Sequence, residues 1–161
     1  MIRALLALML VACSGSPGGP TMNSSMNGGP EQTPQSSSVV SADILSREAV
    51  TNTAQIKHIL IGWKDSGGEG QRDPRAAKRS KKDAEDQVRA LMTQIKAGAD
   101  FDALMKQWSE DPGSASSGRS YEVTPGAQLV IEFKNLGLKL KVDEVGVVES
   151  DFGFHVMKRV Q

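Results

Sequence analysis

The chain has 161 residues with 19 basic and 19 acidic side chains, so its formal net charge at pH 7 is zero. This balance argues against a general affinity for nucleic acid or for anionic membranes. The length allows one domain of ordinary size with tails, and the single cysteine, Cys13, excludes an internal disulfide and a cysteine-rich zinc site.

The N-terminal residues are typical of an export signal. Arg3 supplies a positive charge, and the apolar stretch after it is too short for a membrane span, which needs roughly 20 residues. The run Leu10-Val11-Ala12-Cys13 resembles the bacterial lipobox, in which cleavage before the cysteine leaves a lipid-modified N-terminus. We therefore predict a signal peptide over residues 1–12 and lipidation of Cys13; the alternative is a free cysteine in an ordinary signal peptide. Because Ser14 and not an acidic residue follows, the resemblance implies the outer membrane, if the cell has one.

Residues 13–53 are predicted to form a flexible tether. From Ser14 to about Ser46 the chain is rich in Ser, Gly, Pro, Asn and Gln, and this composition cannot bury enough apolar surface to offset the entropy of ordering. For residues 46–53, a short helical turn and a continuation of the tether both remain open. A folded domain is predicted over residues 54–161.

The domain begins with a predicted strand over residues 55–63, whose alternating side chains place His58 on the face opposite to Ile59 and Ile61. The next stretch contains several glycines and Pro74, which exclude regular structure, and it is basic from Arg72 to Lys82. The basic part has two interpretations. It is either a solvated loop that leads into a helix or a binding site for an anionic peptide, polysaccharide or lipid headgroup.

Two helices are predicted next. The first begins after Ser80, which with Asp83 is close to a capping box, and ends near Gly98. The second follows Asp100, which suits an N-cap. Apolar residues recur at helical spacing in both: Ala84, Val88, Leu91, Met92 and Ile95 in the first, and Phe101, Leu104, Met105 and Trp108 in the second.

The remaining segment mixes short elements. Asp111-Pro112-Gly113 is expected to end the second helix in a turn, and a loop over residues 114–120 and a short strand over 121–123 follow. A third helix is expected over residues 129–138. Two final strands, residues 145–149 and 153–160, are joined by a turn. Because strands and helices do not alternate regularly, the fold class is α+β.

The only two histidines, His58 and His155, lie on the first and the last predicted strand, and we expect the fold to bring them side by side. Metal binding is not supported, because no close cluster of His, Asp and Glu accompanies them. Nucleophilic catalysis is not supported either, since Cys13 is assigned to the lipid and no Gly-x-Ser-x-Gly motif occurs. The remaining interpretation is non-covalent catalysis in an apolar pocket with hydrogen-bonding side chains, without metal or cofactor.

Five segments carry a resemblance to a known family: Lys57–Ile61, Ile95–Phe101, Trp108–Ala115, Phe133 and Gly153–Lys158. In this order and spacing they resemble the parvulin family of peptidyl-prolyl cis-trans isomerases over residues 54–161. The resemblance implies a small antiparallel sheet of about four strands wrapped by three to four helices. This fold agrees with the order of elements predicted above.

The resemblance also implies a set of polar site residues. His58 and His155 match the paired histidines in the floor of the family's site. Asp111 matches a position that is Cys or Asp in the family, and Ser150 matches a Ser or Thr of its hydrogen-bond network. These four residues are the candidate catalytic group.

Two apolar residues complete the implied site. Leu129 and Phe133 match the positions that hold the proline ring in this family. The family motif Gly-Gly-Asp-Leu-Gly is replaced here by residues 118–122, Gly-Arg-Ser-Tyr-Glu, and we expect Ser120 in place of the pocket leucine. This departure leaves two possibilities open, an active isomerase and a site that binds without turnover.

Together, the export signal and the parvulin resemblance predict a lipid-anchored, extracytoplasmic isomerase that assists the folding of exported proteins by binding extended proline-containing polypeptides. We expect it to be a monomer. Rotation about an X–Pro bond faces a barrier of about 18–20 kcal/mol, and this slow step limits folding. One alternative is a weakly or non-catalytic parvulin-scaffold chaperone or peptide-binding lipoprotein. Another is a surface protein that holds an anionic partner with its basic loop.

Overall fold

The computed structural model describes residues 38–67 and 73–161. The predicted signal peptide, Cys13 and the predicted tether up to residue 37 lie outside these residues. The described elements in chain order are α1 (Ala42–Leu45), β1 (Ala54–Ile61), the 3-10 turn η1 (Ala76–Lys78), α2 (Lys81–Lys96), α3 (Phe101–Trp108), α4 (Pro112–Ser117), β2 (Tyr121–Val123), α5 (Ile131–Gly137), β3 (Val145–Ser150) and β4 (Gly153–Arg159). None of these helices is long and apolar enough to cross a membrane.

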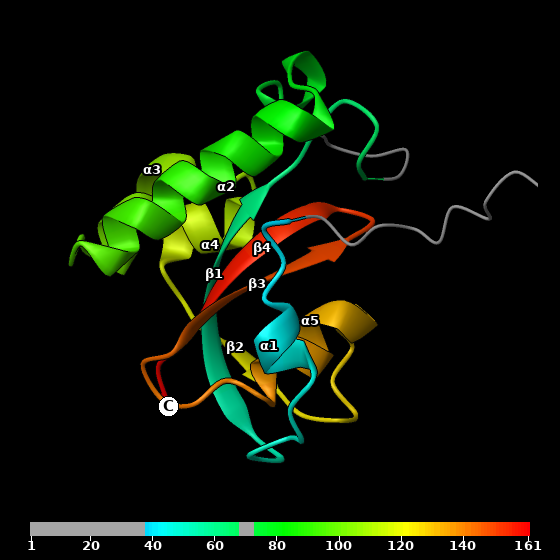
Figure 1. Ribbon diagram of the computed structural model, residues 1–161, viewed down its shortest axis with the longest axis vertical. Coiled ribbons are helices and arrows are strands. Elements are labelled where there is room, and N and C mark those ends of the chain that lie inside the picture. Colours follow the sequence, from blue (N-terminus) through cyan, green and yellow to red (C-terminus); the bar gives the residue numbers. More distant parts are fainter. Residues whose placement is uncertain (1–37, 68–72) are drawn as a thin grey trace, which may run out of the picture. The chain divides into compact units, whose positions relative to one another are not determined.

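An antiparallel sheet of four strands, in the order β2-β1-β4-β3, separates two layers of helices (Figure 1). Helices α2 and α3 pack on one face, and α1 and α5 pack on the other. The predicted α+β fold with about four antiparallel strands is confirmed. The described residues contain five α-helices where three to four were predicted, and α1 and α4 are the two that were not expected.

The strand alternation predicted from the sequence is confirmed. On β1, Ile59 and Ile61 are fully buried in the core under α2 and α3. His58 faces the other way, opposite Met157 of β4, which belongs to the second core. The buried polar side chains of the two central strands, His58 and His155, therefore lie on the face that α1 and α5 cover in part.

The helix ends follow local sequence signals. Ser80 accepts a hydrogen bond from the backbone N–H of Asp83, and the Asp83 carboxylate accepts one from the backbone N–H of Ser80, so the capping box before α2 is complete. Asp100 caps α3 by accepting from the N–H of Ala103 at 2.7 Å. Gly98 follows α2 with a φ of +92°, a left-handed conformation that glycine adopts without steric cost.

The loop expected over residues 114–120 is largely a helix, α4. Pro112 occupies its first turn, where the missing N–H is not needed and the fixed φ of proline favours a helix. Asp111 caps it by accepting from the N–H of Ser114 at 2.8 Å, and Gly118 ends it with a φ of 65°. The Asp-Pro-Gly sequence thus ends α3 and begins α4.

The folded domain begins before residue 54, within the segment assigned to the tether. Ile44 of α1 is only 4% exposed and belongs to the core with Phe133. The N–H of Ser41 donates to the carbonyl of Val147 at 2.9 Å, and the Ser41 hydroxyl accepts from the N–H of Val147 at 2.9 Å. These bonds cover part of the outer edge of β3, so this stretch is ordered despite its polar composition.

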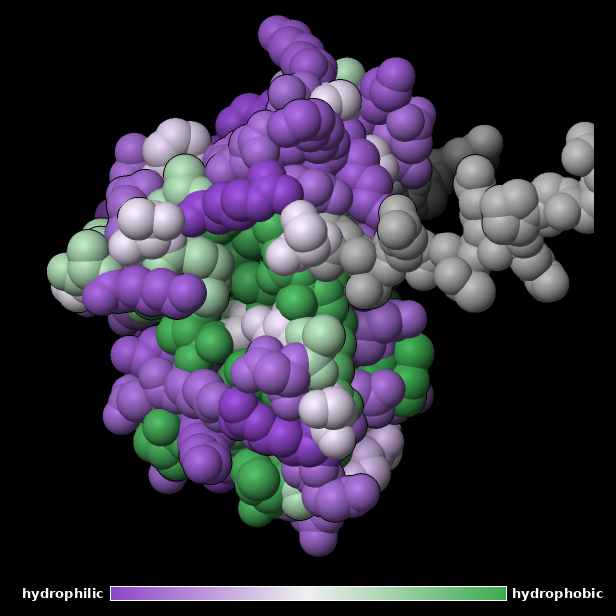
Figure 2. Space-filling model, viewed as in Figure 1, coloured by the Kyte–Doolittle hydropathy of each residue, from purple (hydrophilic) through white to green (hydrophobic). Residues whose placement is uncertain are grey.

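A hollow of about 430 Å³ lies between α2 and the residues just before α1. Figure 2 shows apolar side chains at its floor and polar ones along its rim. Val39, Val88 and Met92 are among the apolar residues that line it. It holds none of the candidate site residues.

Candidate active site

A cleft of about 310 Å³ opens on the sheet face that carries the two histidines. It contains five of the six candidate residues, and the sixth, Ser150, is hydrogen-bonded to His155. The lining residues are His58, Leu60, Asp111, Tyr121, Gln128, Leu129, Val130, Phe133, Phe152 and His155. The cleft therefore combines an apolar rim with a polar floor.

The two imidazoles lie against each other in the floor of the cleft. His58 comes from β1 and His155 from β4, and the strand pairing places Leu60 opposite His155, so the two rings are diagonal neighbours. Their Nδ1 atoms are 3.2 Å apart, and both residues are 5% exposed. The sheet thus brings together the chain's two histidines, as the sequence predicted.

These imidazoles form the middle of a hydrogen-bonded chain. At one end the Ser150 hydroxyl lies 2.7 Å from Nε2 of His155, and at the other end Nε2 of His58 lies 3.3 Å from Oδ2 of Asp111. Burial, together with the nearby His58, lowers the pKa of His155 to about 3, so its ring is neutral at pH 7. An ionised carboxylate only accepts hydrogen bonds, so Nε2 of His58 carries its hydrogen and donates a hydrogen bond to Asp111.

The Asp111 carboxylate is held as an anion. Its Oδ2 also accepts from the backbone N–H of Ser114 at 2.8 Å, from the Ser114 hydroxyl at 2.6 Å and from the Tyr121 hydroxyl at 2.9 Å. The hydrogen bond from His58, followed by those from Ser114 and Tyr121, holds the pKa of Asp111 far below its usual range. Asp111 is therefore a cap for α4 and a charged group in the cleft at the same time.

The apolar side of the cleft comes from α5 and the residues before it. Phe133 meets both imidazoles edge to face, with ring centroids 5.0 Å from His58 and 5.5 Å from His155. Leu129 lies just before α5, is half-buried and lines the same cleft. Together they form an apolar wall beside the polar floor.

Tyr121, and not Ser120, occupies the cleft. The Ser120 hydroxyl donates to Oε1 of Gln55 at 2.8 Å, whereas Tyr121 lines the cleft and pairs with Ile56 on β1. The expectation for Ser120 is wrong because strand alternation puts Tyr121 on the same face as Val123, which is fully buried. That alternation was readable in the sequence.

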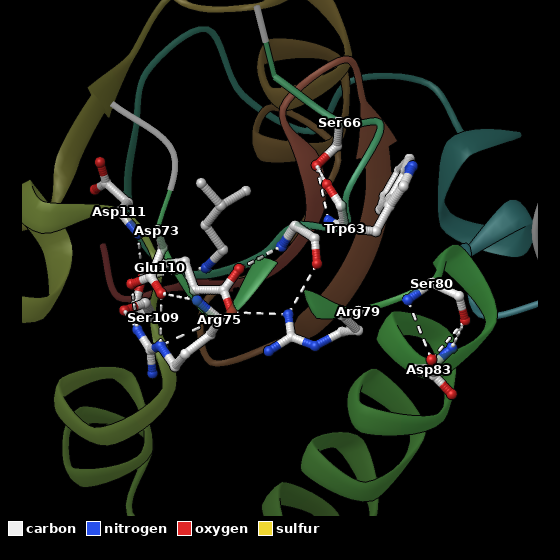
Figure 3. Close-up of polar contacts among 12 residues, drawn as sticks. Trp63, Ser66, Asp73, Arg75, Arg79, Ser80, Asp83, Ser109, Glu110 and Asp111 are labelled. Carbon is white, nitrogen blue, oxygen red and sulfur yellow. Dashed lines mark hydrogen bonds and ion pairs between the residues drawn. The ribbon is translucent and has the colours of Figure 1, made fainter. Parts of the chain in front are cut away.

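The basic loop before α2 is fastened to the fold by ion pairs (Figure 3). Glu110, whose side chain is 2% exposed, pairs with Arg79 at 2.7 Å, and its other oxygen accepts from the backbone N–H of Gly62 at 2.7 Å. Arg75 pairs with Asp73 at 2.8 Å and donates to the carbonyl of Ser109 at 3.0 Å. Both guanidiniums thus have internal partners, which favours the interpretation as a structural loop; Arg72 lies outside the described residues.

Figure 3 also shows that the neighbouring carboxylates of Glu110 and Asp111 point in different directions. Glu110 reaches the arginines of the basic loop, and Asp111 reaches the cleft. The sequence did not single out Glu110, because nothing local distinguishes a buried carboxylate from its exposed neighbours. Its role depends on Arg79, which lies in a different element.

Three comparisons with known proteins bear on this geometry. A family model described as the PPIC-type PPIase domain matches residues 42–161. The chain is similar to the foldase protein PrsA of Geobacillus kaustophilus, with 38% identity over 72 residues that make up 44% of this chain and 26% of that protein. It is also similar to the periplasmic chaperone PpiD of Escherichia coli, with 36% identity over 74 residues, 46% of this chain and 12% of that protein.

Among solved structures, the peptidylprolyl isomerase PrsA from Bacillus cereus superposes with a TM-score of 0.51 at 29% sequence identity, covering 74% of this chain and 38% of that chain. The chain spans about a quarter or less of the length of the two curated relatives.

Proposed function

The chain belongs to the parvulin family of PPIC-type peptidyl-prolyl isomerases, and we propose that it catalyses cis-trans isomerisation of X–Pro bonds in exported polypeptides. The observation that carries this proposal is the hydrogen-bonded chain Ser150–His155–His58–Asp111 beneath an apolar cleft. This arrangement supports a site in which the Asp111 anion lies next to an apolar surface for a proline ring.

The reaction needs no bond to be broken, because its barrier of about 18–20 kcal/mol arises from amide resonance. Phe133 and Leu129 hold the proline ring in the apolar part of the cleft. The charge on Asp111 lies beside the substrate carbonyl, whose oxygen is most negative in the planar amide. A nearby anion therefore raises the energy of the planar form relative to the twisted form, which lowers the barrier.

The histidines and Ser150 act through Asp111 in this proposal. His58 donates to Oδ2 of Asp111, and His155 and Ser150 fix the orientation of His58 through the next two hydrogen bonds. They are positioning groups that keep the carboxylate ionised and aimed at the cleft.

The test is an isomerisation assay with Ala-X-Pro-Phe peptides in which X is varied. Wild type should accelerate the reaction, and Phe133→Ala, Leu129→Ala and Asp111→Ala should each lower kcat/KM by roughly tenfold or more. Val142→Ala is the control, because Val142 is 54% exposed and lies outside the cleft. A wild-type protein without any acceleration would overturn the proposal.

A second candidate is a peptide-binding chaperone with little catalysis. Residues 119–122, Arg-Ser-Tyr-Glu, depart from the family motif at the cleft, and a changed cleft can bind a peptide without lowering its barrier. Suppression of client aggregation by wild type and by Asp111→Ala alike, without isomerase activity, would favour this candidate.

We further propose that the protein works outside the cytoplasm, as a monomer attached by lipid at Cys13. The export signal and lipobox-like run support this placement, and the relative from Escherichia coli is named a periplasmic chaperone. Labelled fatty acid should be incorporated into wild type and not into Cys13→Ser. Sedimentation should give the mass of one chain.

A further inference from the structure

Tyr121 contacts the candidate catalytic group directly, although it is not one of its four residues. Its hydroxyl donates to Oδ2 of Asp111 at 2.9 Å, the same oxygen that accepts from His58 and Ser114. None of the residues that the structure describes donates to Oδ1 of Asp111. All the donors therefore hold one oxygen, which fixes the rotation of the carboxylate and leaves the other oxygen for a ligand in the cleft.

The backbone next to Asp111 makes room for this hydroxyl. A methyl group on Gly113 would lie 2.9 Å from the Tyr121 oxygen, closer than real Cβ contacts. A glycine in the first turn of α4 thus allows the phenol to reach the carboxylate. The side chain at position 113 and the hydroxyl at position 121 depend on each other.

The Tyr121 ring has a second role in the cleft. It meets the His58 ring edge to face at a centroid distance of 5.2 Å and lies 6.0 Å from the Phe133 ring. Tyr121 thus adds a second aromatic surface to the wall formed by Phe133. Burial and the hydrogen bond to Asp111 raise the pKa of Tyr121, so the phenol stays protonated and remains a donor.

We propose that Tyr121 is a positioning and substrate-contacting residue, whose hydroxyl holds Oδ2 of Asp111 so that Oδ1 faces the X–Pro bond, while its ring contacts the substrate. This inference rests on the proposed isomerase function. A merely structural tyrosine would link β2 to α4 and affect stability alone. The two roles of the hydroxyl and the ring predict different kinetic effects.

The experiment compares two variants of Tyr121 with one control in the full chain. Tyr121→Phe keeps the ring and should lower kcat by roughly three- to tenfold with KM unchanged, because one hydrogen bond to a charged group is lost. Tyr121→Leu should lower kcat similarly and also raise KM. Ser120→Ala removes the neighbouring hydroxyl, which bonds Gln55 outside the cleft, and should leave both constants unchanged.

The titration of Asp111 gives a readout that does not depend on turnover. In Tyr121→Phe the pKa of Asp111 should rise toward its usual value, because one donor is missing while those from His58 and Ser114 remain. Carbon-13 NMR of the carboxyl groups measures this shift. The acid limb of the pH–rate profile should move in the same direction.

A double-mutant cycle of Gly113→Ala and Tyr121→Phe tests whether the Tyr121 hydroxyl lies next to position 113. Gly113→Ala should impair wild type, because the new methyl group displaces the Tyr121 oxygen. The same change should have a much smaller effect in Tyr121→Phe, where that oxygen is gone. Additive effects of the two changes would overturn the proposed contact.

The outcomes separate this inference from the proposed function. An inactive wild type would overturn the isomerase proposal, and the Asp111 titration would still decide whether Tyr121 positions the carboxylate. An active wild type with the same kcat, KM, pH profile and Asp111 pKa in Tyr121→Phe would overturn the inference alone.

Discussion

At the scale of single residues, the burial of His155 determines its protonation state. It is 5% exposed, and its two ring nitrogens are engaged by Ser150 and His58. A charged ring there would lose hydration without gaining a carboxylate partner in contact. The ring is therefore kept neutral so that it can relay a hydrogen bond.

We predict that the His155 ring does not titrate between pH 5 and 8, since burial lowers its pKa to about 3. Two-dimensional 1H–15N NMR of the imidazoles measures this, and a chain with only two histidines needs one variant for assignment. A His155 ring that titrates near its ordinary value of 6.5 would contradict the buried relay.

Residue-scale features were predictable where one local pattern decides them. Strand alternation put His58 and Ile59 on opposite faces, and the resemblance supplied Asp111 and Phe133. Strand alternation on β2 also puts Tyr121 on the same face as the apolar Val123, so the position of Tyr121 in the cleft was predictable as well. Glu110 was not predictable, because its burial depends on Arg79 and Gly62 in other elements.

At the scale of elements, the ion pairs of Glu110 decide how the basic loop is held. The Arg79 side chain is 12% exposed and that of Glu110 is 2% exposed. The loss of either partner therefore leaves the other charge unpaired and poorly hydrated. The loop between β1 and α2 is thus fixed at its C-terminal end, beside the cap of α2.

Glu110→Gln should lower the free energy of unfolding by about 3 kcal/mol, because it leaves Arg79 buried without its carboxylate. Urea unfolding measures the change. Asp86→Asn, which breaks exposed ion pairs with Lys82 and Arg89 on α2, is the matched control and should have no measurable effect.

The same geometry makes a prediction about anionic ligands. The Arg75→Gln and Arg79→Gln double variant should lose stability while its salt-dependent retention on an anionic resin stays close to that of wild type, since both guanidiniums already have internal partners. Lost retention at full stability would instead support an anion-binding loop.

The short helix α1 extends the domain beyond its predicted boundary. Ile44→Ala should cost about 2–4 kcal/mol, because the side chain is 4% exposed and its removal leaves a cavity against α5. Val50→Ala in the same segment should have little effect, since Val50 is 49% exposed. Thermal or urea unfolding measures the stability of both variants. If Ile44→Ala were as stable as Val50→Ala, α1 would be dispensable for the fold.

The elements differ in how far they could be predicted. Helices α2 and α3 carry an apolar stripe and caps in their own sequence, so their ends were found. Helix α1 has one core residue, Ile44, within a polar stretch, and α4 has no apolar stripe at all. The formation of α1 depends on contacts with β3, which no local pattern reports. The cap and the proline of α4 are local signals, but they fit a turn as well as a short helix.

At the scale of the whole molecule, the buried site makes stability depend on pH. The folded pKa of His155, about 3, lies below its ordinary value of 6.5, so the unfolded chain binds a proton over a range in which the folded protein does not. Asp111 adds a second effect of the same sign at lower pH, because its pKa is also lowered in the folded state. The contribution of these two groups to the free energy of unfolding is therefore fully present above about pH 6.5, the ordinary pKa of histidine, and it is lost progressively as the pH falls.

We predict that the free energy of unfolding falls by about 2 kcal/mol between pH 7 and pH 5 from His155 alone. Urea unfolding at several pH values measures the slope, and the interval from pH 8 to pH 7 should be flat for this group. Unchanged stability down to pH 5 would contradict a neutral, buried imidazole.

The carboxylate at position 111 has a consequence for the environment in which the protein works. A thiol at that position would be open to sulfenic and sulfonic acid formation and to alkylating reagents. The only sulfhydryl in the sequence is that of Cys13, far from the cleft in the chain. Peroxide and thiol-directed inhibitors therefore have no target among the residues that line the cleft, and the site keeps its chemistry under oxidising conditions.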